Sequence, residues 1–142
     1  RPGVRFLSLF QWPLFPHRRM EPTPSNAVLS PLPAGAGGEE IRNVVENVWL
    51  PEIDKFQPDL MILSAGFDAH CEERIAQLKA GEMDYACVTR LLVEASFAYC
   101  EGRLVSVLEG GYELRSLARS VFTHLQGLIR NPLPAETCKD PN

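Results

Sequence analysis

Short apolar runs bounded by turn residues predict the strands of this chain. Residues 60–63 and 103–108 are mostly apolar, as expected for central strands covered on both faces of a parallel sheet. Residues 4–10 alternate between apolar and polar side chains and predict a further strand. A short strand is also expected near residues 27–29.

Apolar side chains recur at helical spacing in residues 39–56, 83–100 and 113–129. Pro51 is expected to kink or split the first of these helices. The stripes expected to be buried in the other two are Tyr85, Val88, Leu92, Ala95 and Tyr99, and Leu114, Leu117, Val121, Leu125 and Leu128. Strands that alternate with helices predict an α/β fold of three layers (α/β/α) around a mostly parallel sheet.

Composition and the positions of the prolines set the expected domain limits. The chain has 142 residues, 45% hydrophobic and 23% charged, which predicts a globular domain. Six of the 12 prolines fall within residues 11–36, so this stretch is predicted to be largely loop. Residues 1–130 are predicted to form the domain and residues 131–142 a proline-containing tail. No apolar run reaches the roughly 18 residues that a membrane span requires.

Charge and cysteine spacing exclude other classes of protein. Residues 1–20 carry four arginines and no acid, so the net charge of −4 leaves −8 on the rest of the chain. We expect no direct nucleic-acid binding, because phosphate contacts need clustered Lys and Arg. Cys71, Cys87, Cys100 and Cys138 form no Cys-x-x-Cys pair or zinc-finger pattern, and are expected to be reduced thiols of an intracellular protein.

Two turns that follow apolar strands carry the candidate chemistry. Residues 64–70 contain Asp68, and residues 109–112 contain Tyr112. If the two strands are parallel, both turns lie at the same edge of the sheet, where ligands bind in open α/β folds. A carboxylate there suits a divalent metal, and a tyrosine hydroxyl is a donor for a developing oxyanion. The alternative is that Asp68 caps a turn and Tyr112 packs against a helix.

These segments resemble motifs of the histone deacetylase and acetylpolyamine amidohydrolase superfamily, most evidently its class II-like and bacterial members. The similar stretches are Phe-Leu-Ser-Leu at 6–9, Pro-Leu-Pro-Ala-Gly-Ala-Gly-Gly at 31–38, Pro-Asp-Leu at 58–60, Ser-Ala-Gly-Phe-Asp-Ala-His at 64–70, Ser-Val-Leu-Glu-Gly-Gly-Tyr at 106–112 and Leu-Ala-Arg-Ser-Val at 117–121. The resemblance extends over residues 4–130. It implies an arginase-deacetylase fold and zinc-dependent hydrolysis of an acetylated lysine side chain or an acetylpolyamine.

The resemblance also implies roles for individual residues. Asp68 matches one of two aspartates that bind zinc together with a histidine, and Tyr112 matches the tyrosine that polarises the acetyl carbonyl. Gly110 and Gly111 match the glycines that shape the substrate channel, and Ile75 is expected on the wall of this channel. Three protein ligands would leave one zinc position open for water and substrate.

A structural potassium site is implied at the strand over residues 4–10. Ser8 matches a residue that contributes a hydroxyl to this site, and Leu9 matches one that contributes a carbonyl oxygen.

The histidines depart from the family pattern. Members carry a His-His pair and an Asp-x-His motif upstream of the Phe-Leu-Ser-Leu strand, and only residues 1–5 precede that strand here. His17, His70 and His124 are not adjacent to one another; His70 is expected at the rim or in packing, and His124 as a surface or satisfied core residue. One carboxylate cannot hold catalytic zinc tightly and no paired base is present, so the chain alone is predicted to be inactive.

We therefore expect the C-terminal portion of a deacetylase. Such a portion would expose a sheet edge that its missing strands would cover, which favours self-association or pairing with the N-terminal portion. Phe10 replaces a usual His, residues 16–19 replace a Gly-Thr-Gly loop, and Arg74 replaces a proline that follows an acid. These changes affect the expected substrate entrance rather than the fold.

Two other classes of function are weighed against the deacetylase portion. The loop over residues 35–38 precedes a helix, as in nucleotide-binding proteins, but it lacks the third glycine of a dinucleotide fingerprint. Glu39 and Glu40 would also repel a phosphate at that helix end. The absent histidines favour the other alternative, a non-catalytic remnant that acts as an interaction module.

Overall fold

The computed structural model describes residues 3–14 and 23–129. Its elements are β1 (Phe6–Gln11), β2 (Ala27–Leu32), α1 (Gly38–Val44), η1 (Val45–Trp49), α2 (Leu50–Phe56), β3 (Met61–Ala65), α3 (Glu82–Cys100), β4 (Leu104–Leu108) and α4 (Leu114–Leu128). The predicted tail, His17 and the loop over residues 16–19 lie outside the described residues. The predicted strands and helices are otherwise confirmed, with ends that differ by a few residues.

The first predicted helix is split close to Pro51, as expected. It consists of α1, the π-helical segment η1 and α2, and Pro51 lies in the first turn of α2. Proline has no backbone N–H to donate to the preceding turn, so the regular hydrogen-bond ladder cannot continue through this position.

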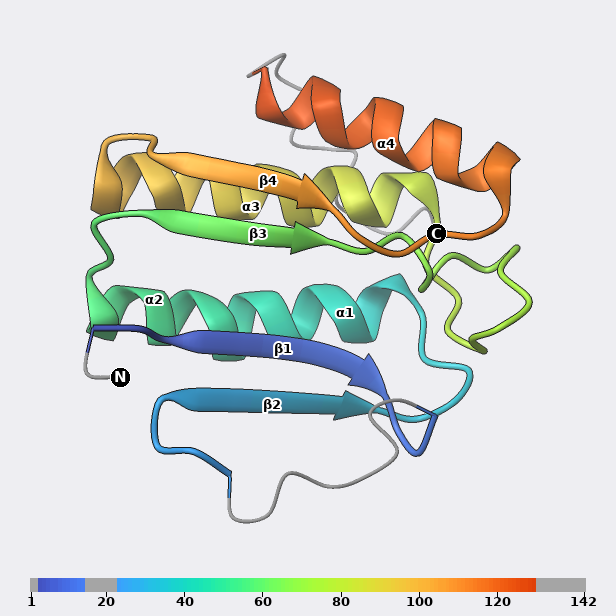
Figure 1. Ribbon diagram of the computed structural model, residues 1–142, viewed down its shortest axis with the longest axis horizontal. Coiled ribbons are helices and arrows are strands. Elements are labelled where there is room, and N and C mark those ends of the chain that lie inside the picture. The colour runs from blue at the N-terminus through green and yellow to red at the C-terminus, as the bar shows by residue number, and fades with distance from the viewer. Residues whose placement is uncertain (1–2, 15–22, 130–142) are drawn as a thin grey trace.

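The strands form two separate parallel pairs. Strand β1 pairs with β2 in the register Phe6↔Ala27, and β3 pairs with β4 in the register Met61↔Leu104. All four strands run in the same direction, in the spatial order β4, β3, β1, β2 (Figure 1). The predicted α/β class with parallel strands is confirmed, and among the described residues β1 and β3 do not pair.

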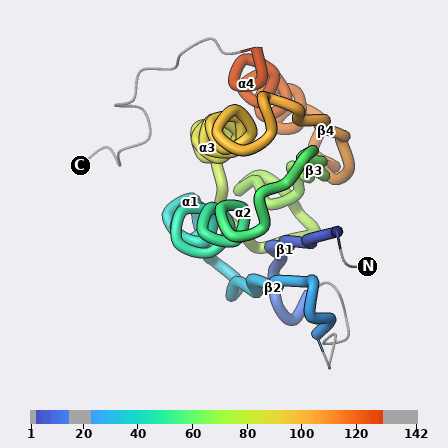
Figure 2. Tube along the Cα trace, turned by 90° about the vertical axis from the view of Figure 1, so that its left-hand side faces the viewer, coloured from blue at the N-terminus to red at the C-terminus, as the bar shows by residue number. Residues whose placement is uncertain are grey.

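The helices cover one face of the strands. Figure 2 shows α1, α2 and α3 on the same side of all four strands. Val45 of η1 and Leu92 and Ala95 of α3 form a core with strand residues such as Leu7 and Leu63. On the opposite face, the large apolar side chains remain about half exposed or more; these are Phe6, Ile62, Val105 and Val107. The described helices therefore supply one helical layer of the predicted three-layer arrangement.

Helix α4 corrects one prediction. Its buried residues are Ser116, Ser120 and His124, whereas Leu114 is 76% exposed and Leu125 is 48% exposed. The predicted buried stripe through Leu114 and Leu125 is therefore wrong. Small residues allow α4 to pack closely on α3, because a methyl group on Gly127 would lie only 2.9 Å from Cγ2 of Thr89.

The cysteine prediction is wrong at one position. Cys87, within α3, is disulfide-bonded, while Cys71 and Cys100 carry free thiols. The spacing of cysteines along the chain does not reveal which thiols meet in the fold, which is why this prediction fails.

Among the described residues, no helix is both long enough and apolar enough to cross a membrane.

Candidate functional site

The turns that follow β3 and β4 meet at one edge of their parallel pair. The amide of Phe67 donates to the carbonyl of Gly110 at 2.8 Å, and the amide of Glu109 donates to the carbonyl of Ala65 at 3.1 Å. Because the strands are parallel, their carboxyl ends lie together, and so do the two motif-bearing turns. The structure thus brings together the backbone segments that carry Asp68 and Tyr112.

The Asp68 carboxylate occupies space that a side chain at position 110 would fill, and this position is a glycine. A methyl group on Gly110 would lie 2.8 Å from Cγ of Asp68 and 2.9 Å from each carboxylate oxygen. Gly111 has a φ of +128°, a conformation that favours glycine, and a methyl group there would lie 2.7 Å from Cδ1 of Leu117. Both glycines are therefore required by local geometry at the junction of the two turns.

A buried carboxylate holds the backbone of Tyr112. The Glu73 side chain accepts the amide of Tyr112 at 2.7 Å and the amide of Glu113 at 2.9 Å. Glu73 is only 8% exposed, and these two bonds join the loop after β3 to the start of α4. This role of Glu73 was not predicted from the sequence, although the acid that precedes Arg74 in the family pattern was a signal for it.

Tyr85 of α3 contacts the turn that follows β3. Its hydroxyl donates to the carbonyl of Phe67 at 3.0 Å, and the two rings lie 5.1 Å apart. Burial raises the pKa of the Tyr85 hydroxyl, and the negative charges of Asp68 and Glu73 raise it further. Tyr85 therefore stays protonated and remains a donor.

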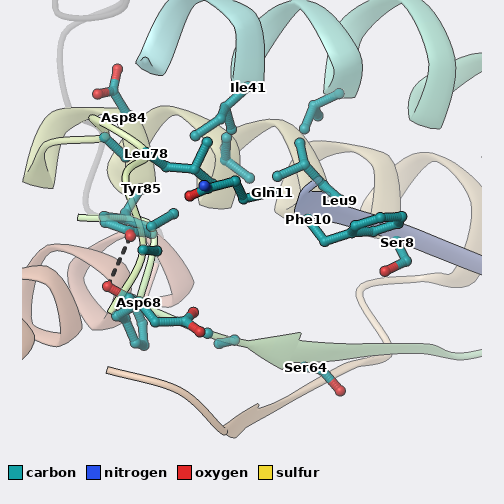
Figure 3. A pocket seen from close by; sticks show the side chains of 18 of the residues that line it. Ser8, Leu9, Phe10, Gln11, Ile41, Ser64, Asp68, Leu78, Asp84 and Tyr85 are labelled. Atoms are coloured by element: carbon teal, nitrogen blue, oxygen red, sulfur yellow. Dashed lines mark hydrogen bonds between the residues drawn. The ribbon is translucent and has the colours of Figure 1, made fainter. Parts of the chain in front are cut away.

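A cavity of about 730 Å³ lies between β1 and β3. Asp68 lines one wall, and Ser8 and Leu9 line the opposite wall (Figure 3). Tyr112 and Ile75 are not among the described lining residues and are 61% and 59% exposed. The structure therefore brings Asp68 to the cavity with the predicted potassium residues, and leaves the Tyr112 side chain near the surface.

The described residues do not form a complete zinc site around Asp68. The one group of three metal-type side chains among them is His70, Glu72 and Glu82, which does not include Asp68. Arg119 donates to both Glu72 and Glu82. Its guanidinium holds the pKa of Glu82 at about 2, so the two carboxylates already have a cation partner.

The two described histidines have packing roles. His70 is 2% exposed, stacks on Tyr85 at 6.5 Å, and accepts the amide of Glu72 through Nδ1 at 3.1 Å. His124 lies between Thr89 at 2.7 Å and Ser106 at 2.8 Å. His124 is thus a satisfied core residue.

The glycine loop before α1 is filled by carboxylates. The amide of Gly37 donates to Glu40 at 2.8 Å. A methyl group on Gly38 would lie 1.8 Å from Oδ1 of Asp84, which shows how closely this second carboxylate approaches. Negative charge at this helix start opposes phosphate binding, so the structure gives no support to the nucleotide-binding alternative.

Comparisons with known proteins agree with these motifs. The sequence model of the histone deacetylase domain matches residues 1–128. "Histone deacetylase 10, chloroplastic" of Oryza sativa subsp. japonica is 32% identical over 146 residues, which cover 99% of this chain and 33% of the relative. "Polyamine deacetylase HDAC10" of Mus musculus is 37% identical over 100 residues, covering 70% of this chain and 14% of the relative.

Solved structures show the same likeness. The crystal structure of the HDA15 HD domain matches with a TM-score of 0.80 and 26% identity, covering 94% of this chain and 40% of that one. The structure of the histone deacetylase Clr3 matches with a TM-score of 0.78 and 27% identity, covering 94% of this chain and 24% of the Clr3 chain. This is an incomplete α/β fold of the arginase-deacetylase type. The chain belongs to the histone deacetylase family and is a fragment of a deacetylase domain, spanning about a third of the rice relative.

Proposed function

We propose that this chain supplies part of the active site of a zinc-dependent deacetylase and is inactive without the rest of the domain. The observation that supports this most directly is the junction of the turns after β3 and β4. There, the Asp68 carboxylate lies against Gly110, and Glu73 fixes the backbone of Tyr112. The match to the histone deacetylase domain supports the proposal that this junction takes part in deacetylation.

Asp68 is proposed as one ligand of the zinc ion. A bound zinc ion supplies a Lewis acid for the acetyl carbonyl and lowers the pKa of a bound water. Because no group of three donors surrounds Asp68 among the described residues, the remaining ligands are proposed to come from the part of the domain that this chain does not cover.

Tyr112 is proposed to donate its hydroxyl to the carbonyl oxygen of an acetylated lysine side chain or an acetylpolyamine. Its side chain is 61% exposed, so a substrate can reach it, while its backbone is held by Glu73. A donor fixed in advance of the reaction stabilises developing negative charge at low reorganisation cost. Gly110, Gly111 and Ile75 are proposed to border the substrate channel.

Several sequence-based predictions remain predictions. Ser8 and Leu9 line the cavity from β1, and their part in a potassium site is a proposal. The limits of the domain at residues 1–130, the absence of direct nucleic-acid binding, self-association and an intracellular location also remain predictions.

The experiment combines this chain with the remainder of the rice histone deacetylase 10, that is, its part outside the matched region. We expect deacetylation of an acetyl-lysine peptide or N-acetylputrescine by the mixture and none by this chain alone. Tyr112→Phe should lower kcat by about 10²–10³-fold. Tyr99→Phe, the same chemical change on the far end of α3, is the control and should leave the rate unchanged. An active isolated chain, or equal rates for Tyr112→Phe and Tyr99→Phe, would contradict the proposal.

A further inference from the structure

The loop over residues 71–80 carries an arginine that the site described above does not use. Arg74 is exposed and directly follows Glu73, the carboxylate that accepts the amides of Tyr112 and Glu113. Consecutive Cα atoms lie about 3.8 Å apart, so the backbone of Arg74 is one residue away from this contact. Figure 1 shows the loop beside the connection between β4 and α4. Arg74 therefore borders the proposed oxyanion donor, Tyr112.

The guanidinium of Arg74 has no hydrogen-bond or ion-pair partner among the residues that the structure describes. The neighbouring acids accept hydrogen bonds from other donors. Glu72 accepts from Arg119, and the buried carboxylate of Glu73 accepts from backbone amides. Glu113 accepts an amide of the first turn of α4. The positive charge of Arg74 is therefore available to a group of the substrate.

Two further exposed side chains adjoin Arg74. Ile75 follows it in the loop and is 59% exposed, and Tyr112 is 61% exposed. Arg74 also takes the place of the proline in the family motif, so this chain has one more positive charge at this position. A substrate whose acetyl group reaches the Tyr112 hydroxyl would bring its flanking groups over this surface.

We propose that Arg74 is a specificity-determining residue, which selects an acetylated lysine flanked by acidic side chains and disfavours an acetylpolyamine. This inference rests on the proposed function, because it requires the substrate to reach Tyr112. An arginine guanidinium pairs with a carboxylate through two parallel N–H donors, so an acidic side chain is a group that it recognises well. The free ammonium of an acetylpolyamine has the same charge as Arg74 and would be repelled.

The expected size of the effect follows from the exposure of Arg74. An exposed pair of opposite charges changes an equilibrium by about two- to fivefold. Salt reduces such an effect, because the screening length falls to about 3 Å at about 1 M salt. The preference for acidic flanking groups should therefore be moderate and sensitive to salt.

The test uses the full 142-residue chain combined with the remainder of the rice protein. It compares two acetyl-lysine peptides of equal length, with Glu or with Lys on either side of the acetylated residue, and N-acetylputrescine. Arg74→Gln should lower the preference in kcat/KM for the Glu peptide by about threefold or more, against both the Lys peptide and N-acetylputrescine. The change should appear mainly in KM, because a contact with flanking groups is the same before and during the reaction.

Two control variants separate charge from loop structure. Arg74→Lys keeps the positive charge and should keep most of the preference. Lys79→Gln removes a positive charge from an exposed position farther along the same loop and should leave the preference unchanged. An equal loss of preference in Lys79→Gln would overturn the proposal. A fall in kcat for all three substrates in Arg74→Gln, with the preference unchanged, would show a structural role only and would also overturn it.

The failure of this proposal and the failure of the proposed function give different results. Hydrolysis with the same preference in Arg74→Gln and in the unmodified protein would overturn the specificity role of Arg74 and leave the proposed function standing. No hydrolysis of any of the three substrates by the mixture would overturn the proposed function, and the role of Arg74 with it.

Discussion

Single side chains at the junction of the two turns determine how the candidate site is built. The Glu73 carboxylate accepts hydrogen bonds from two backbone amides, those of Tyr112 and Glu113, rather than from a basic side chain. Asp68 lies where any side chain on Gly110 would collide with it. Tyr112 itself has an exposed side chain, so its position depends on the backbone beneath it.

The hydrogen bonds of Glu73 make a prediction about the loop. Glu73→Ala should destabilise the fold by about 1–3 kcal/mol, because it leaves two amides without an acceptor. The amides of Tyr112 and Glu113 should exchange faster in this variant. Glu72→Ala, which removes a neighbouring carboxylate that pairs with Arg119 at the surface, is the matched control. If both variants behave alike, Glu73 does not hold the Tyr112 backbone.

The close contact between Gly110 and Asp68 predicts that substitutions at these two positions have non-additive effects on the free energy of unfolding. Gly110→Ala should cost about 1–3 kcal/mol, because its methyl group meets the Asp68 carboxylate. In an Asp68→Ala background, the colliding atoms are gone and the same change should cost much less. Denaturant titrations of the four proteins in this cycle measure the coupling, and simple additivity would show that the close approach does not determine the stability.

At the scale of elements, the sequence predicts most of what is local. Periodicity predicts the strands and helices, and Pro51 predicts the break between α1 and α2. Periodicity fails for α4, because it treats apolar residues as buried, whereas α4 buries Ser116 and Ser120 to approach α3. The role of Glu73 was not predicted, because it depends on two loops 39 residues apart meeting in space.

His124 predicts a pH dependence for the packing of α4. Thr89 donates its hydroxyl proton to the carbonyl of Tyr85, so it accepts from Nδ1 of His124, and Nε2 accepts from Ser106. Burial lowers the pKa of His124 in the folded state. As the pH falls, the unfolded state, with a pKa of about 6.5, takes up its proton first, so the free energy of unfolding should fall below about pH 6.5.

Melting temperatures between about pH 5 and pH 8 measure this effect. His124→Gln removes the titrating ring, so its melting temperature should depend less on pH than that of the unmodified chain, even if it is lower throughout. Parallel pH profiles for the two proteins would rule out the contribution of His124.

At the scale of the whole molecule, the fold is two halves of a parallel sheet on a shared helical floor. The order of the strands was not predictable from the sequence, because apolar patterns identify strands without stating their neighbours. The cavity between β1 and β3, the apolar face that carries Ile62 and Val105, and the partial coverage of every relative described above fit one account. In this account, the chain is proposed to supply one part of a zinc site, and the remainder of the domain is proposed to supply the other part.

Zinc titration of the chain combined with the remainder of the rice relative tests this account most directly. We expect the mixture to bind zinc at a ratio near unity, and Asp68→Asn to weaken the binding by at least about tenfold, because it removes the negative charge of the proposed ligand. Glu109→Gln, the same loss of charge at the end of β4, should leave zinc affinity unchanged. Undiminished zinc binding by the Asp68→Asn mixture would contradict the assignment of Asp68 to the metal site.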